Sequence, residues 1–118
     1  FALFKKKIST LAKNEGIITQ VIQVLRLLEH DETLSIDIVA KTLNLSVRSL
    51  QRKLKEVSVT FSAVRVEFLI EQSKTLLEQP ALTMDMIAER LKFSDRAAFS
   101  RAFKRIVGVS PSQYRQHL

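Results

Sequence analysis

The sequence contains no cysteine and is poor in glycine and proline, with two of each among 118 residues. Without cysteine, the chain has no disulfide framework, thiolate metal site, cysteine nucleophile or iron–sulfur cluster. So few glycines and prolines supply too few turns for a sandwich or barrel, which reverses direction every 8 to 12 residues or so. No apolar run approaches the roughly 18 residues that a membrane-spanning helix needs. Together these absences favour an all-α fold.

The composition is that of a folded chain, with 46% hydrophobic and 26% charged residues. Its length fits one compact domain, or two small ones that share a connector. The formal net charge is +7, which predicts a polyanionic partner. Composition alone leaves open whether that partner is nucleic acid or anionic lipid.

The excess positive charge lies in two short windows. Residues 46–56 contain four bases and one acid, and residues 92–107 contain five bases and one acid. Elsewhere the bases and acids balance. The sequence therefore predicts two basic patches and not a uniformly basic surface.

Capping residues and apolar spacing divide the chain into helices. After a predicted linker or artificial remnant at residues 1–16, apolar residues recur every three or four positions over residues 17–28. Ser35 and Ser46 are predicted N-caps of the next two helices. Thr60 or Ser62 is predicted to begin a longer helix that runs to residue 79, where Pro80 follows. Gly108 is a predicted helix stop, and Ser110 followed by proline is predicted to cap the last helix.

The chain repeats itself after Pro80. Residues 83–88 match residues 35–40 in character position by position, 48 places apart. With one extra residue in the turn, Phe99, Arg101, Phe103 and Lys104 fall 49 places after Leu50, Arg52, Leu54 and Lys55. Agreement of caps, alanine and basic residues indicates an internal duplication, whose unit is a short helix, a tight turn and a second helix.

A small residue in the first helix of each pair, Ala40 or Ala88, lets the second helix cross close against it. This is helix-turn-helix geometry, and a B-DNA major groove about 12 Å wide admits such a second helix. The two basic windows coincide with the predicted second helices. Each arginine by itself is equally consistent with a solvated helix face, and the repeated placement is what favours DNA binding.

The chain resembles a known family over residues 17–118. The run IAERLKFSDRAAFSRAFKRIVGVSPSQYR at residues 87–115 is similar to the signature of the AraC/XylS class of bacterial transcriptional regulators. LSVRSLQRKLKE at residues 45–56 is similar to its more variable partner motif. The resemblance implies a DNA-binding domain with two helix-turn-helix subdomains, residues 17–59 and 80–118, joined by a connector helix at residues 60–79. It implies that the base-reading positions are Arg48, Gln51, Arg52, Arg96, Ala97, Ala98, Ser100 and Arg101.

Side-chain chemistry suits these roles. Arginine can donate two hydrogen bonds to guanine, glutamine pairs with adenine, and alanine contacts the thymine methyl group. Arg52 and Arg101, deeper along their helices, fit a phosphate contact or a stabilising ion pair equally well. The expected phosphate contacts, which supply register and affinity, are Ser46, Lys53, Lys55, Lys104 and Arg105. Phe93 and Tyr114 are expected in packed faces and not as base-stacking platforms.

The length of the predicted connector also limits the distance between the two recognition helices. At roughly 1.5 Å per residue, a helix over residues 61–79 is about 28 Å long. With its flanking turns it can hold two recognition helices about 34 Å apart, one turn of DNA. Because the two units differ in sequence, the expected target is asymmetric, with one recognition helix in each of two successive major grooves.

Four positions depart from the family pattern. Lys92 stands in the second turn where glycine is usual, and Ser58 replaces a common glycine. Leu69 and Ser73 replace an arginine and an alanine that are frequent in the connector. Lys92 needs either an ordinary backbone conformation or a strain cost of about 1 kcal/mol at positive φ.

Two other functions compete with DNA binding. His30 and His117 have no fixed partner and no accompanying phosphate loop, metal spacing or nucleophile motif, so an enzyme is not expected, nor a cofactor or metal. A basic amphipathic helix that binds anionic membrane or a partner protein is the alternative. It would not require two matched units.

The resemblance extends to expectations about the whole protein. It implies a bacterial, cytoplasmic transcription factor whose N-terminal sensor or dimerisation domain is separate from these residues. RNA polymerase is a further candidate partner, and this fragment is expected to be monomeric. The target sequence, the effector and the direction of regulation do not follow from these residues.

Overall fold

The computed structural model describes residues 16–28 and 34–118, and its regular elements there are all α-helices. The all-α class predicted from the sequence is confirmed. Most of the predicted N-terminal linker and the interruption that contains His30 lie outside the described residues.

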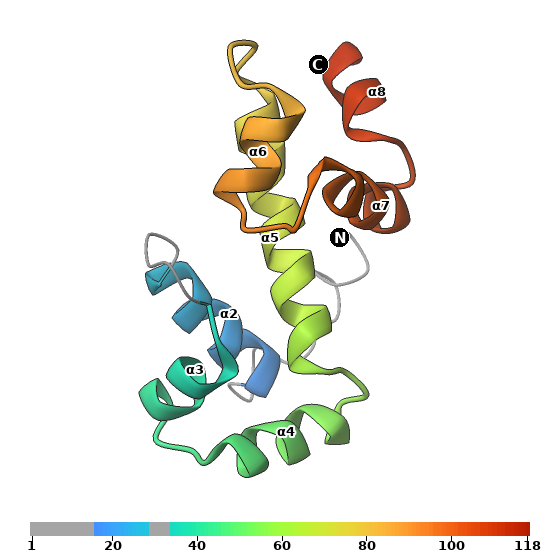
Figure 1. Cartoon of the computed structure of the whole chain (residues 1–118). Coiled ribbons are helices and arrows are strands. Elements are labelled where there is room, and N and C mark those ends of the chain that lie inside the picture. Colours follow the sequence, from blue (N-terminus) through green and yellow to red (C-terminus); the bar gives the residue numbers. More distant parts are fainter. Residues whose placement is uncertain (1–15, 29–33) are drawn as a thin grey trace. The chain divides into compact units, whose positions relative to one another are not determined.

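These residues form two compact units, one ending at Phe68 and the other beginning at Leu69. The first unit contains α2 (Ile17–Leu27), α3 (Ile36–Thr42), α4 (Val47–Glu56) and the first part of α5 (Phe61–Leu77). The second contains the remainder of α5, α6 (Met84–Arg90), α7 (Arg96–Val107) and α8 (Pro111–Gln116). Figure 1 traces this order through the sequence colours.

The predicted N-caps begin the helices. The Ser35 hydroxyl accepts a hydrogen bond from the Ile38 N–H at 3.3 Å, and Thr83 accepts the equivalent bond from Met86 at 3.1 Å. Thr60, and not Ser62, begins α5, because its hydroxyl accepts the Ala63 N–H at 3.1 Å. Each such bond satisfies a backbone donor that the first helical turn leaves unpaired. Local sequence thus specifies the start of α3 and α6, and for α5 it leaves two candidates of which the structure selects Thr60.

Each unit has its own apolar core. In the first unit, α2 packs against α3 and α4, and α3 packs against α4. Its core side chains are Ile18, Val21, Ile22, Val24, Leu25, Val39, Ala40, Leu50, Leu54, Val64 and Phe68. In the second unit, α6 packs against α7 and α7 against α8. Its core side chains include Ile70, Leu77, Ile87, Ala88, Leu91, Phe99 and Phe103.

The second core contains a row of aromatic rings. The Phe99 ring lies 5.6 Å from that of Phe93 and 5.8 Å from that of Phe103, measured between centroids. The Tyr114 ring of α8 meets Phe103 edge-on at 5.5 Å. Offset or edge-on pairs at these separations are the favoured aromatic geometries. Phe93 and Tyr114 thus lie in packed faces, as the sequence predicts.

The long helix α5 ends at Leu77, two residues before the predicted end. The last N–H groups, those of Glu78 and Gln79, donate to carbonyls three residues back, which tightens the turn. Pro80 disfavours helical geometry at Gln79, so the helix does not continue. The carbonyls of Leu77 and Gln79 instead accept bonds from the Arg115 guanidinium, at 3.0 Å from Nε and 3.2 Å from Nη2. At 17 residues, α5 is about 26 Å long.

Three helix ends use a left-handed residue that is not glycine. Asn44, Ser58 and Lys92 have φ values of 58°, 62° and 65°. In each case the next N–H bonds to a carbonyl five residues back, as from Phe93 to Ala88 at 2.9 Å, which is the Schellman arrangement. Lys92 therefore adopts the strained conformation of the two that the sequence left open. Gly108 ends α7 at φ 99°, as predicted.

Candidate nucleic-acid interface

In the first unit, α4 offers a basic face. Ser46 caps the helix, and its hydroxyl accepts the Ser49 N–H at 3.0 Å and donates to the Ser49 hydroxyl at 2.9 Å. Leu50 and Leu54 are completely buried and hold the inner edge of the helix. The outer positions are exposed at Arg48, Gln51, Arg52 and Lys55, and half-buried at Lys53. Apolar anchoring of one edge thus leaves the opposite edge cationic.

In the second unit, α7 repeats this arrangement with different residues. The Asp95 carboxylate caps it by accepting the Ala98 N–H at 2.7 Å, and Phe99 and Phe103 are completely buried. The predicted site residues are exposed at Arg96, Ala97, Arg101, Lys104 and Arg105, and half-buried at Ala98 and Ser100. Within each unit, the structure brings the predicted residues together on one helix.

The caps fix the register between the two helices. Arg48 is the second residue of α4, whereas Arg96 is the first residue of α7. The counterpart of Arg48 is therefore Ala97, while Arg52 and Arg101 are counterparts of each other. The first arginine of each helix therefore lies at a different distance from the helix N-terminus. The two helices expose different hydrogen-bond donors at equivalent positions.

The structure bears on the alternatives for Arg52 and Arg101. In the part of the chain that the structure describes, neither side chain makes a hydrogen bond or an ion pair. The stabilising ion pair considered for them is therefore absent there, and both guanidinium groups remain available to bases or phosphates.

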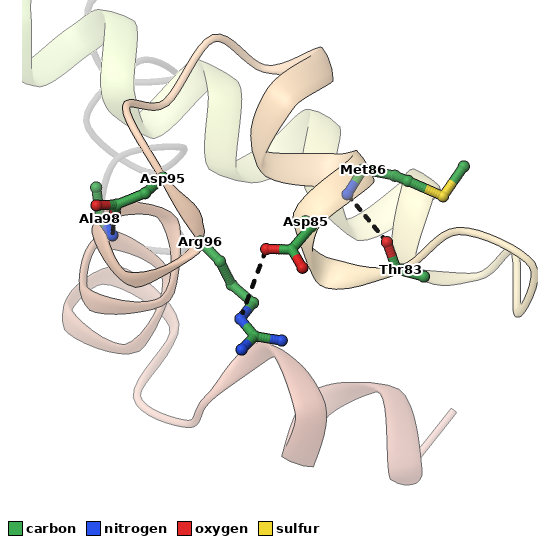
Figure 2. A network of polar contacts seen from close by, with 6 residues as sticks. All are labelled: Thr83, Asp85, Met86, Asp95, Arg96 and Ala98. Atoms are coloured by element: carbon green, nitrogen blue, oxygen red, sulfur yellow. Dashed lines mark hydrogen bonds and ion pairs between the residues drawn. The ribbon is translucent and has the colours of Figure 1, made fainter.

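An ion pair does occur at Arg96. Its Nε lies 3.7 Å from Oδ1 of Asp85 on α6, and Figure 2 shows the two side chains facing each other. Both are well exposed, at 61% and 74% of the side-chain area. Solvent and salt weaken such a pair, so its contribution to stability is small.

The sequence did not identify the roles of Arg115 and Asp85. Arg115 holds carbonyls at the end of α5 that are 36 and 38 positions away, and no local pattern signals a contact over that separation. Asp85 is an acid in the first turn of α6, a placement that its favourable interaction with the helix dipole explains without any partner. Its counterpart Asp37 occupies the same position in α3.

Comparison with known proteins gives the class of this domain. A family model described as "Helix-turn-helix domain" matches residues 39–117. The Msm operon regulatory protein of Streptococcus mutans is 35% identical over 92 residues, which cover 76% of this chain and 33% of that protein. This chain therefore spans about a third of that relative's length.

Solved structures share the fold. An AraC-type transcriptional regulator from Chromobacterium violaceum has a TM-score of 0.76 at 24% identity, over 90% of this chain and 95% of that one. The DNA-binding domain of AdpA, crystallised with a target DNA, has a TM-score of 0.67 at 23% identity, over 86% of this chain and 91% of that one.

These matches define a helix-turn-helix domain of the transcriptional-regulator class. The chain belongs to the AraC-type helix-turn-helix family, as the sequence resemblance implied. Among residues 16–28 and 34–118, no helix is both long enough and apolar enough to span a bilayer.

Proposed function

We propose that this chain is the DNA-binding domain of a bacterial transcriptional regulator, with α4 and α7 as its two recognition helices. The observation that carries the proposal is the repeated design of these helices. Each has two fully buried residues on one edge and exposed arginine and lysine on the opposite edge. A rigidly anchored helix with a cationic outer face suits insertion into a major groove. The fold likeness to a domain crystallised on DNA supports the same proposal.

Base reading falls to the exposed and half-buried positions in the first two turns of each helix. Arg48 and Arg96 donate to guanine O6 and N7, and Gln51 pairs with adenine. Ala97 and Ala98 offer methyl contacts to thymine, and Ser100 can donate or accept. Arg52 and Arg101 have no partner within the described residues, so they are free to reach the same bases or the adjoining phosphates. Because α4 and α7 differ in side chains and register, the proposed target is asymmetric.

The phosphate contacts fall to residues that flank these faces. Lys53 and Lys55 lie in the last turn of α4, and Lys104 and Arg105 lie in the last turn of α7. Ser46 contributes a hydroxyl at the start of α4. Such contacts release condensed counterions, so they supply salt-dependent affinity with no base preference.

Membership of the family also suggests the other domains, the protein partner and the location of the whole protein. We infer that a separate sensor or dimerisation domain accompanies this domain in the whole protein, since this chain matches only 33% of the Streptococcus mutans relative. RNA polymerase is the proposed protein partner, the cytoplasm the proposed location, and this domain by itself a monomer. We assign no catalytic step, because the relative from Streptococcus mutans is a regulatory protein.

Selection of bound sequences from a random duplex pool tests the proposal. We expect enrichment of one asymmetric site with two blocks of preference about 10 base pairs apart, the pitch of the double helix. Titration against anionic vesicles is the parallel arm. Binding to vesicles without salt-dependent binding to duplex DNA would instead support the membrane alternative.

Arg48→Ala should weaken binding to the selected site by about 1 to 3 kcal/mol and relax the preference at one base pair. The reason is loss of a two-pronged contact with guanine. Binding isotherms on the selected site and on single-base variants measure both effects. Arg26→Ala on α2, also exposed, is the matched control and should change neither. Equal weakening on selected and random duplexes would make Arg48 a phosphate contact.

Lys55→Ala should weaken binding to every duplex alike and lower the slope of log affinity against log salt by about one. Loss of one counterion-releasing contact predicts that unit change. Affinities at four or five salt concentrations give the slope. An unchanged slope would remove Lys55 from the interface.

A further inference from the structure

Arg96 is the residue of α7 whose side chain can extend furthest beyond the N-terminal end of the helix. It is the first helical residue, directly after the capping carboxylate of Asp95. Helix-turn-helix proteins read base edges with the N-terminal residues of the recognition helix. The environment of the Arg96 guanidinium therefore bears on what the proposed interface can recognise.

The Asp85 carboxylate faces one nitrogen of that guanidinium. Oδ1 of Asp85 lies 3.7 Å from Nε of Arg96, and Figure 2 shows the two terminal nitrogens extending beyond the pair, away from the carboxylate. A two-pronged contact with guanine O6 and N7 needs two N–H donors. An acid on the Nε side leaves the terminal nitrogens free to provide them.

We propose that Asp85 is a positioning residue that holds Arg96 in place to read guanine; this inference rests on the proposed DNA-binding function. An arginine side chain has much rotamer freedom, and ordering it on binding costs affinity. A carboxylate that already restrains the guanidinium reduces that cost. When DNA covers the pair, the local dielectric falls and the attraction strengthens.

The same carboxylate opposes binding to the wrong surface. Asp85 is 74% exposed, so its charge repels nearby phosphates wherever the helix docks. On a non-specific duplex this repulsion has no compensating base contact. Asp85 thus lowers non-specific affinity while it supports one specific contact, and discrimination between partners depends on both effects.

The neighbouring groups are consistent with this assignment. An open hollow of about 480 Å³ is lined by Asp85, Glu89, Lys92 and Arg96, together with residues of the turn. Glu89, one helical turn beyond Asp85, and Asp95, the cap of α7, also line the hollow. Among the described residues, neither makes an ion pair with Arg96, so Asp85 is the one of these three acids that pairs with it.

The first unit contains a natural control. Asp37 is the repeat counterpart of Asp85, and both are exposed second residues of their helices. The recognition helix of the first unit begins with Val47, where α7 begins with Arg96. Asp37 makes no ion pair among the residues described. The chain thus holds the same acid twice, once with an arginine partner and once without.

The experiment uses the full 118-residue chain and the duplex site selected from the random pool. Affinities are measured at one salt concentration for that site, for all its single-base variants and for an unrelated duplex. The variants are Arg96→Ala, Asp85→Ala, Asp37→Ala and the double change of Arg96 and Asp85 to alanine. Thermal unfolding of each variant is recorded in parallel.

Arg96→Ala should abolish most of the preference for guanine at one base pair, roughly a tenfold loss of discrimination. Asp85→Ala should reduce the preference at the same base pair about threefold, the scale of an exposed ion pair. It should also raise affinity for the unrelated duplex. In the Arg96→Ala background, loss of Asp85 should have no further effect on base preference.

Asp37→Ala separates the positioning role from a structural one. It should raise affinity for the unrelated duplex and shift thermal unfolding as Asp85→Ala does, because both acids stabilise the first turn of a short helix. It should leave every base preference unchanged. If Asp37→Ala altered the same base preference as Asp85→Ala, a general charge effect would replace the proposed pairing.

The experiment distinguishes failure of the positioning role of Asp85 from failure of the proposed DNA-binding function. Asp85 has no positioning role if its removal leaves base preference intact while removal of Arg96 abolishes it, and DNA binding then still stands. The same conclusion follows if Asp85→Ala lowers the preference equally with and without Arg96. If the unchanged chain prefers no duplex in the pool, the proposed function itself fails.

Discussion

The two helix-turn-helix units build the same turn from different residues. The left-handed position is Asn44 in the first unit and Lys92 in the second, with φ values of 58° and 65°. The hydrogen bond that closes each turn, from Leu45 to Ala40 or from Phe93 to Ala88, is 2.9 Å long in both. The packing of the helix pair therefore sets the backbone conformation of the turn. The residue type sets only the free-energy cost of that conformation. Asparagine tolerates this region better than lysine does.

A second difference lies between the turn and the recognition helix. The second unit has one more residue there, and its cap is Asp95 where the first unit has Ser46. That insertion places Arg96 at the first helical position, within reach of Asp85. The first unit has Val47 at that position and its first arginine one residue later. A one-residue change in a turn thus alters which side chain begins the second helix without altering the fold.

The largest expected effect concerns the two cores. Phe99→Ala should destabilise its unit by about 3 to 5 kcal/mol, and Leu50→Ala, at the matching position, by about 2 to 4. Both side chains are completely buried, but Phe99 also loses ring contacts with two neighbours. Urea unfolding measures the totals, and hydrogen exchange assigns the loss to a unit. A greater loss for Leu50→Ala would contradict this ranking.

An intermediate effect is expected at Arg115, whose contacts have no counterpart in the described part of the first unit. Arg115→Ala should lower stability by about 1 to 2 kcal/mol, because the carbonyls of Leu77 and Gln79 lose a charged donor. Arg115→Lys should recover only part of this, since lysine has a single nitrogen in place of the two separated nitrogens, Nε and Nη2, that reach the two carbonyls. Thermal unfolding checks both. Full recovery with lysine would mean that charge alone, and not the forked geometry, stabilises this helix end.

The smallest effect sharpens the comparison of the turns. Lys92→Gly should stabilise the protein by about 0.5 to 1 kcal/mol, because relief of left-handed strain outweighs the greater entropy of the unfolded chain. Asn44→Gly should change stability by less, since asparagine bears little strain there. Urea midpoints compare the two variants directly. Equal stabilisation at both sites would show that residue type does not set the cost of the turn.

Much of the fold was predictable because its signals are local. Ser35, Ser46, Thr83 and Ser110 begin helices where their side chains cap the first turn, and the apolar spacing correctly selects the buried edges of α4 and α7. The end of α5 was predicted from Pro80 to within two residues, whereas the contacts of Arg115 were not predictable, since they join residues 36 and 38 positions apart. The assignment of base-reading residues stays a prediction, as does the 34 Å spacing of the recognition helices.

The sequence by itself determined the helices, the caps at Ser35, Ser46, Thr83 and Ser110, and the duplicated arrangement, because capping and amphipathic spacing act within a few residues. It also determined that the positive charge falls on the second helix of each pair. Only the tertiary structure decided that Lys92 adopts a left-handed conformation and that Asp85 faces Arg96. Both depend on how one helix packs against another, which brings together groups that the linear chain keeps apart.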